Sequence, residues 1–246
     1  MNVLIGIDDT DNRTSRGTGF RARDMAKHIH ENRLGKVSGI TRHQLFVAPQ
    51  IPYTSQNSSA CLHIEAIDCD TLQRFCINYL LQTAVDGADI GFCMAEEWKI
   101  GADIISWGQR AKKEVLTQNE AKQLAQINHF VLKGLTATKD GIIVVLAAVA
   151  LRKSGDDGRF IFLQGKELRE LKGFYYYHEL KNISNIDEIK TKQGAKIPEN
   201  ARLDLGDWVR PVLKNNKSTL IVEHYKNGKN ESFRVSTKEY IKSISD

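Results

Sequence analysis

The pattern of apolar positions in the first hundred residues switches repeatedly between the period of a strand and the period of a helix. Short or alternating apolar runs predict strands, and apolar positions three and four residues apart predict helices. In chain order, the predicted elements are a strand at 3–5, a helix at 18–33, strands at 40–47 and 62–66, a helix at 72–80 and a strand at 88–94. This order of elements is the ferredoxin-like pattern.

The pattern of apolar and polar residues changes twice after this region. Residues 99–115 and 119–132 are polar and amphipathic, and residues 141–151 are almost entirely apolar, so we expect a helical middle. From residue 159 onwards, aromatic and β-branched residues mix with turn signals, and residues 218–225 and 231–235 predict the two strands of a hairpin. The patterns predict an α+β protein with an α/β core and a smaller β-rich C-terminal part.

The domain boundary is expected near residues 154–158, where the polar run Ser-Gly-Asp-Asp-Gly predicts a turn. We therefore divide the chain into a nucleotide-binding core at 1–155, which includes the ferredoxin-like part, and a β-rich part at 156–246.

Composition adds moderate constraints to this picture. The chain has 246 residues, of which 41% are hydrophobic and 26% charged, which suits a folded protein with a substantial core. The net charge of +5 is compatible with an anionic ligand, but no dense Lys/Arg block indicates nucleic acid. The four cysteines lack zinc-type spacing, and we expect reduced thiols in a cytoplasmic protein. No apolar run is long enough to span a bilayer, so we expect no membrane partner.

Three carboxylates follow the first predicted strand. Asp8, Asp9 and Asp11 lie within four residues of each other, and such crowding is unfavourable unless a cation or water screens it. Mg²⁺ takes one or two carboxylates together with phosphate oxygens, and ligands of open α/β sheets lie beyond the carboxyl ends of strands. These residues predict a magnesium site, although a solvated Asp-rich turn gives the same pattern.

A glycine-flanked threonine then opens the first predicted helix. Gly17 and Gly19 allow backbone N–H groups to approach a phosphate at the helix N-terminus, and Arg16 offers a charge-assisted contact. The hydroxyl of Thr18 has two interpretations. It is the N-cap of the helix, or it faces a γ-phosphate and receives the phosphoryl group.

At this point the residues resemble a known family, the archaeal tRNA agmatinylcytidine synthetases (TiaS). The resemblance is carried by Gly6-Ile7-Asp8-Asp9-Thr10-Asp11, the Gly17-Thr18 turn, Ile51-Pro52-Tyr53-Thr54, Gly141-Ile142-Ile143 and Leu146-Ala147-Ala148-Val149, over roughly the first two-thirds of the chain. Enzymes of this family use ATP to activate an anticodon cytidine through a phosphorylated intermediate and then add agmatine. They combine a kinase-like domain and a ferredoxin-like domain with OB-fold and zinc-ribbon modules that hold tRNA.

The resemblance implies roles for particular residues of this chain. Asp8, Asp9 and Asp11 would form the magnesium and ATP group, with Asp8 and Asp9 catalytic, and Thr18 would be the threonine that becomes phosphorylated. The ATP would also contact Gly6, Thr10, Arg16, Gly17, Gly19 and Gly141. The sequence has no paired-cysteine zinc ribbon, so the acceptor, a small molecule or an RNA, is left open. We expect a short, stand-alone relative of the catalytic core.

Two other functions fit parts of the same pattern. The chain can be a non-catalytic protein that binds a nucleotide or RNA, and a homodimer is compatible with this function. Haloacid-dehalogenase-type phosphatases also place an Asp nucleophile after a first strand, with a second Asp two residues on, where this chain has Thr10. The aromatic run 173–178 is also ambiguous, since it fits a β-strand in the core or at a dimer interface as well as a surface that stacks bases.

Overall fold

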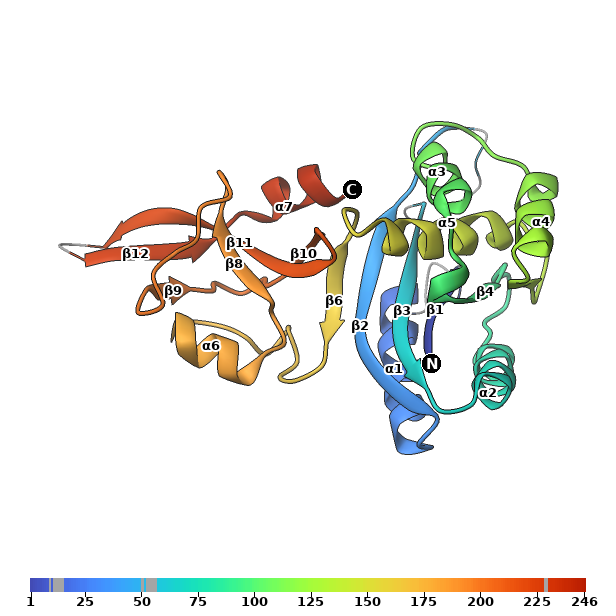
Figure 1. The fold of residues 1–246 in the computed structure, drawn as a ribbon, viewed down its shortest axis with the longest axis horizontal. Coiled ribbons are helices and arrows are strands. Elements are labelled where there is room, and N and C mark those ends of the chain that lie inside the picture. The colour runs from blue at the N-terminus through green and yellow to red at the C-terminus, as the bar shows by residue number, and fades with distance from the viewer. Residues whose placement is uncertain (9, 11–15, 50, 52–56, 228–229) are drawn as a thin grey trace. The chain divides into compact units, whose positions relative to one another are not determined.

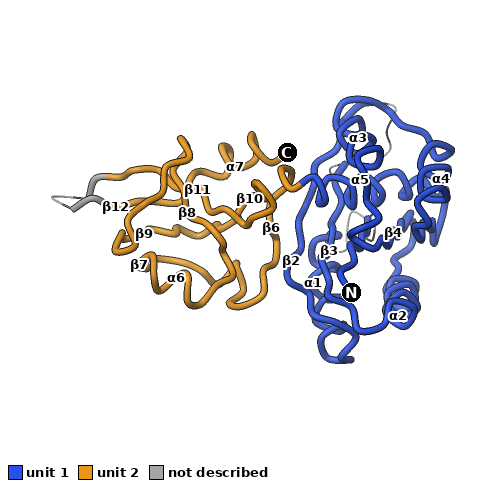
Figure 2. The backbone as a smooth tube through the Cα atoms, in the orientation of Figure 1, with its two compact units in different colours: residues 1–154 blue, residues 155–246 orange. Residues whose placement is uncertain are grey.

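The computed structural model describes residues 1–8, 10, 16–49, 51, 57–227 and 230–246. Two compact units, Met1–Ser154 and Gly155–Asp246, divide the chain (Figure 2). Among the described residues, no helix has both the length and the apolar character needed to cross a membrane. The four cysteines, all within the described part of the chain, are free thiols.

The N-terminal unit is built on an antiparallel sheet (Figure 1). Its strands are β1 (Asn2–Asp8), β2 (Gly35–Gln44), β3 (Ser58–Ala66), β4 (Gly91–Glu96) and β5 (Val131–Gly134), in the spatial order β5-β4-β1-β3-β2. β1 pairs antiparallel with both β3 and β4, so it lies inside the sheet and is buried from Val3 to Asp8. The order β4-β1-β3-β2 confirms the predicted ferredoxin-like arrangement.

Helices cover this sheet. They are α1 (Thr18–Glu31), α2 (Cys69–Gln82), α3 (Ala102–Arg110), α4 (Gln118–Ile127) and α5 (Gly141–Ser154), with a short 3₁₀ turn at Glu97–Lys99. α1 buries Ala22, Met25, Ala26 and Ile29 and contacts β1, β2 and β3. α5 packs on the sheet face that carries Leu4, Cys61 and Cys93, and α3 and α4 pack against α5. The almost continuous burial of α5 explains why its sequence is apolar all round.

Three glycines bring α5 into direct contact with the sheet backbone. A Cβ atom on Gly6 of β1 would lie 2.3 Å from the carbonyl oxygen of Val145 in α5. A Cβ on Gly91 of β4 would lie 2.4 Å from the carbonyl oxygen of Gly141, and one on Gly141 would lie 2.5 Å from that of Asp89. No other residue type fits these positions without a shift of the backbone, so the glycines fix the N-terminal half of α5 against β1 and β4.

The C-terminal unit is mostly β-structure, as expected, and its core is separate from that of the N-terminal unit. It contains β6 (Arg159–Leu163), β7 (Phe174–Tyr176), α6 (Tyr177–Ile183), β8 (Glu188–Thr191), β9 (Arg202–Asp204), β10 (Val212–Lys214), β11 (Lys217–Asn227), β12 (Asn230–Val235) and α7 (Lys238–Ser245). The strand order is β6-β10-β11-β12-β9-β7, and β8 pairs with β11. The predicted hairpin is β11–β12.

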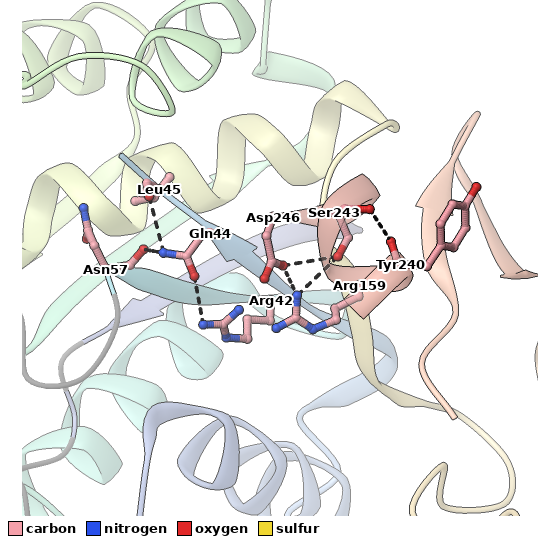
Figure 3. A network of polar contacts seen from close by, with 9 residues as sticks. Arg42, Gln44, Leu45, Asn57, Arg159, Tyr240, Ser243 and Asp246 are labelled. Carbon is pink, nitrogen blue, oxygen red and sulfur yellow. Dashed lines mark hydrogen bonds and ion pairs between the residues drawn. The ribbon is translucent and has the colours of Figure 1, made fainter. Parts of the chain in front are cut away.

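Near the two ends of this unit, Arg159 is buried and forms an ion pair with Asp246 and a hydrogen bond of 3.2 Å to Ser245 Oγ (Figure 3). Within α7, Ser243 Oγ donates to the carbonyl oxygen of Tyr240 at 2.8 Å. These contacts connect the first strand of the C-terminal unit to its last helix.

Several local predictions were wrong. The segment 119–132 is not helical throughout, because α4 ends at Ile127 and β5 begins at Val131. The second strand, predicted at 40–47, is observed at Gly35–Gln44. The aromatic strand β7 is not a core strand: Phe174 and Tyr176 are exposed, and only Tyr175 points towards the core.

Candidate functional site

Asp8 ends β1 inside the sheet and beside the start of α5. It pairs with Gly91 of β4, and Gly91 contacts the backbone of Gly141, the first residue of α5. Only 9% of Asp8 is exposed. The strand partner of Asp8 thus lies against the N-terminus of α5, the end of a helix dipole that favours negative charge.

A cation lies close enough to interact with this carboxylate. Burial lowers the pKa of the half-buried Arg42 on β2, and the negative charge of Asp8 opposes that shift. Arg42 Nη2 also donates to Gln44 Oε1 at 3.1 Å, so its guanidinium is oriented by a second acceptor. Arg42 was not among the predicted site residues. It is far from Asp8 in the sequence, and nothing in the sequence indicates that the two residues are close in the fold.

The structure brings Thr10 and Thr18 together. Thr10 is almost fully buried just after β1, and its Oγ1 donates to Thr18 Oγ1 at 3.4 Å. Thr18 is the first residue of α1 and is only partly buried. The Thr10 hydroxyl is thus buried, and the Thr18 hydroxyl lies at the start of α1.

The start of α1 is a helix N-terminus without a capping side chain. Gly17 is the N-cap and supplies no capping side chain, and the first turn contains no acidic residue. The backbone N–H groups of Phe20 and Arg21 both donate to the carbonyl oxygen of Gly17. Gly17 and Arg16 are exposed, and the Arg16 guanidinium lies 4.5 Å from the centre of the Phe20 ring. These features leave the helix dipole without a negative charge from its own first turn.

Two of the predicted metal ligands, Asp9 and Asp11, lie outside the described residues. Among the residues that are described, no group of three or more His, Cys, Asp and Glu side chains is arranged to hold a metal ion. Of the three predicted carboxylates, only Asp8 lies among the described residues. Since Mg²⁺ usually completes its shell with phosphate oxygens and water, one buried carboxylate at this position fits a nucleotide-bound Mg²⁺.

Gly6 and Gly141, predicted nucleotide contacts, are placed by the structure at close backbone approaches between α5 and the sheet. Both lie along the path from Asp8 to the N-terminus of α5. Gly141 lets the start of α5 approach Asp89 and Gly91, and Gly6 lets β1 approach Val145, one turn into the helix.

The entry to α5 is organised by Asp89, which the sequence did not single out. Its carboxylate accepts hydrogen bonds from the backbone N–H of Lys139 at 2.8 Å and of Asp140 at 3.0 Å, and from the Thr138 hydroxyl. Thr136 Oγ1 further bonds to the backbone of Ala88 and Ile90. The loop before α5 is therefore tied to the segment before β4, some fifty residues earlier.

Polar residues also line the strands beside Asp8. Ser59 on β3 donates to the carbonyl oxygen of Val144 at 3.1 Å, and the fully buried His43 lies 2.7 Å from Thr41 Oγ1 on β2. His43 pairs with Ser59 across the two strands. Gln44 Nε2 donates to the carbonyl oxygen of Asn57 at 2.8 Å, which joins the end of β2 to the start of β3 (Figure 3).

The fold is that of an α+β protein with a ferredoxin-like sheet. Its candidate site consists of the buried Asp8, the hydrogen-bonded Thr10 and Thr18, and the N-termini of α1 and α5. No family model matches the chain, and no curated protein matches it either. Several solved structures, however, are similar to the chain. A tRNA fluorescent labelling enzyme is 26% identical, with a TM-score of 0.53, over 61% of this chain and 36% of that one.

The similarity extends to TiaS, a tRNA agmatidine synthetase. Its apo structure is 25% identical over 61% of this chain and 35% of that one, and its complex with tRNA and ATP is 25% identical over 61% and 36%; both have TM-scores of 0.53. The resemblance seen in the sequence motifs is confirmed as structural similarity. The chain spans only about a third of the length of these enzymes.

Proposed function

We propose that the N-terminal unit binds ATP with Mg²⁺ at the carboxyl end of β1 and transfers a phosphoryl group, in a reaction related to tRNA modification. The observation that carries this proposal is the buried Asp8 carboxylate beside the N-terminus of α5, with Thr10 and Thr18 hydrogen-bonded nearby. Support also comes from the similarity to TiaS, one structure of which is a complex with tRNA and ATP.

In this proposal, different residues bind the metal, bind the phosphates and accept the phosphoryl group. Asp8 holds Mg²⁺, which neutralises phosphate charge when bound, and Asp9 and Asp11 are proposed to share this role. The backbone of Gly17 to Gly19 and the guanidinium of Arg16 receive phosphate oxygens at the start of α1. Because phosphoryl transfer depends mostly on positioning and charge neutralisation, these groups suffice to orient ATP.

Thr18 is proposed as the covalent acceptor. Its hydroxyl attacks the γ-phosphorus, the bond to the β–γ bridging oxygen breaks, ADP leaves, and the hydroxyl proton passes to a carboxylate at the end of β1. Thr10, through its hydrogen bond to Thr18, orients the attacking oxygen. The phosphoryl group then passes to an RNA or small-molecule acceptor, and the similarity to a tRNA-bound enzyme favours RNA.

Isothermal titration with ATP, with and without Mg²⁺, tests the binding step. We expect Mg²⁺-dependent binding in the native chain and at least tenfold weaker binding in Asp8→Asn, which removes one charge and preserves volume. Glu65→Gln, an exposed carboxylate on β3, is the matched control and should bind as the native chain does. Equal affinity in Asp8→Asn and the native chain would place the nucleotide at another site, and no binding by the native chain would contradict the proposal.

Incubation with γ-³²P-ATP followed by mass spectrometry tests the covalent step. Label should appear on Thr18, disappear in Thr18→Ala, and fall in Thr10→Val, which keeps the shape of Thr10 without its hydroxyl. Label that survives in Thr18→Ala would eliminate the covalent step. ATP binding with no label in the native chain would favour a protein that binds the nucleotide without turning it over.

A further inference from the structure

One face of the C-terminal sheet carries aromatic and arginine side chains that no core contact accounts for. In β7 and β9, Tyr176 pairs with Arg202, whereas Tyr175 pairs with Leu203. Successive side chains of a strand point to opposite faces. Tyr175 and Leu203 belong to the core, so Tyr176 and Arg202 lie on the outer face together with Phe174, two residues before Tyr176.

The same outer face continues across the next two strands. Arg202 of β9 pairs with Ser232 of β12, and Ser232 pairs with Tyr225 of β11. Arg234, two residues after Ser232, is on this face as well. We call Phe174, Tyr176, Arg202, Tyr225 and Arg234 the aromatic face.

The arginines of the aromatic face lie over its rings. The Arg202 guanidinium is 4.4 Å from the centre of the Phe174 ring, and that of Arg234 is 5.7 Å from the centre of the Tyr225 ring. The ring of the exposed His178 stacks on Tyr176 at 5.8 Å with an interplanar angle of 16°. One side of the Phe174 ring is therefore covered by the Arg202 guanidinium and one side of the Tyr176 ring by the His178 ring, and the face combines aromatic rings with two arginines.

Phe174 and Tyr176 are open to solvent, whereas Tyr225 is only partly exposed and Ser232, between Arg202 and Tyr225, is buried. Phe174 is 51% exposed and Tyr176 is 48% exposed. α7 packs on Val212 and Ile221, and Ile221 lies on the same side of β11 as Tyr225, so α7 adjoins the aromatic face at β11. Two carboxylates share this face: Asp204 pairs with Phe174 and Arg234 and accepts from the Gly206 N–H, and Glu223 bonds to Lys192 and Arg234. Exposed aromatics beside cationic charge fit a partner that supplies planar groups and negative charge.

Pairing of another strand with the edge of β7 is a poorer explanation. β7 has only three residues, and short edge strands discourage strand addition. Tyr176 also donates its backbone N–H to Glu179 Oε2 at 2.8 Å, so a side chain of the same unit already uses that donor. The outer face, rather than the strand edge, is the accessible surface.

We propose that the aromatic face binds single-stranded RNA, with unpaired bases stacked on Phe174 and Tyr176 and phosphates near Arg202 and Arg234. Stacking on aromatic side chains next to cations is the means by which proteins hold single strands without reading their sequence. The surface follows from the C-terminal unit alone, and the choice of RNA over DNA rests on the proposed function.

Fluorescence anisotropy with a labelled twelve-nucleotide uridine RNA, in the absence of ATP, tests this surface on the full chain. Loss of base stacking weakens binding by about five- to 150-fold per base, so we expect the Kd of Phe174→Ala/Tyr176→Ala to rise at least tenfold. Phe174→Leu/Tyr176→Leu keeps apolar bulk, guards against misfolding and should show a similar loss. Trp98→Ala is the matched control, because Trp98 is an exposed ring with a lysine over it in the N-terminal unit.

The other results would each overturn the proposal. They are undetectable RNA binding by the native chain, unchanged affinity in both folded double variants, equal loss in Trp98→Ala, or stronger binding of RNA duplex or of oligothymidine DNA. A native dimer in sedimentation that dissociates in the double variants would assign the face to self-association instead. Asp8→Asn should retain RNA affinity, so failure of the proposed ATP site leaves this test intact.

Discussion

At the scale of single residues, His63 on β3 is held in a partly buried polar chain at the opposite end of β1 from Asp8. Its Nδ1 lies 2.9 Å from Ser38 Oγ, its Nε2 lies 3.2 Å from Glu97 Oε2, and Glu97 in turn pairs with Lys153 at 3.3 Å. Burial and the neighbouring Arg152 lower the pKa of His63, and the charge of Glu97 opposes that shift. The folded protein therefore favours the neutral imidazole.

This shift predicts a pH dependence of stability. As pH falls below about 6.5, the usual pKa of histidine, the unfolded chain takes up the His63 proton before the folded chain does. Stability from this group is present above that pH and falls towards acid, by at most about 1.4 kcal/mol per pH unit. Urea unfolding between pH 7.5 and 5 should show a shallower decline for His63→Gln than for the native chain.

An unchanged slope of unfolding free energy against pH in His63→Gln would contradict the burial argument.

At the scale of elements, the contact between α5 and β1 depends on glycine, and its replacement has a predictable cost. In Gly6→Ala the new Cβ meets the Val145 carbonyl oxygen at 2.3 Å, and backbone on both sides prevents relief by side-chain rotation. Overpacking of this kind costs about 1–3 kcal/mol or more. Urea unfolding should show a loss in the upper part of that range.

Gly101→Ala is the comparison for this variant. Its Cβ would meet only the flexible side chain of Asp103, so we expect a change below about 1 kcal/mol. Equal losses in the two variants would mean that the close approach of α5 does not determine the result.

The loop before α5 gives a second prediction at this scale. Asp89→Ala removes the acceptor for two backbone N–H groups and the Thr138 hydroxyl. A lost cap costs about 1–2 kcal/mol. Hydrogen exchange should accelerate at Lys139 and Asp140 while amides in the middle of α5 keep their protection; unchanged exchange at both residues would contradict the role of Asp89.

The elements that the sequence predicted best are those with strong local periodicity. The first helix was expected at 18–33 and is observed at Thr18–Glu31, and the hairpin β11–β12 lies where alternating residues flank a turn. β5 was missed because its four residues have no pattern of their own and are a strand only through pairing with β4.

The candidate site was predictable only where its residues are neighbours in sequence. Asp8, Thr10 and Thr18 stand within eleven residues of each other, and the structure places Thr10 against Thr18. Arg42, Ser59 and Asp89 come from other strands and loops. Only the register of the sheet and the packing of α5 bring them near, and a single sequence carries no signal of either.

At the scale of the whole molecule, the net charge of +5 is modest for a protein that binds nucleic acid. The aromatic face contributes two arginines, one of which already bonds to Glu223. A single strand releases about 0.7 counterions per neutralised phosphate. The logarithm of the RNA affinity should therefore fall with the logarithm of salt concentration with a slope of only about −0.7 to −1.4.

Anisotropy titrations from 50 to 300 mM KCl measure this slope. A steep dependence, of about −4 or beyond, would mean that a diffuse field of lysines and arginines binds the RNA. In that case the rings of the aromatic face would have little part in binding.

The glycine contacts of α5 also limit how the N-terminal unit responds to a ligand. Side chains absorb small displacements by changing rotamer, but Gly6, Gly91 and Gly141 meet the opposing backbone with no side chain between them. A ligand that pushes on the start of α5 must therefore displace β1 and β4 along with it. Because no side chain separates the two backbones, we expect Asp8 and the start of α5 to keep a fixed spacing when a ligand binds.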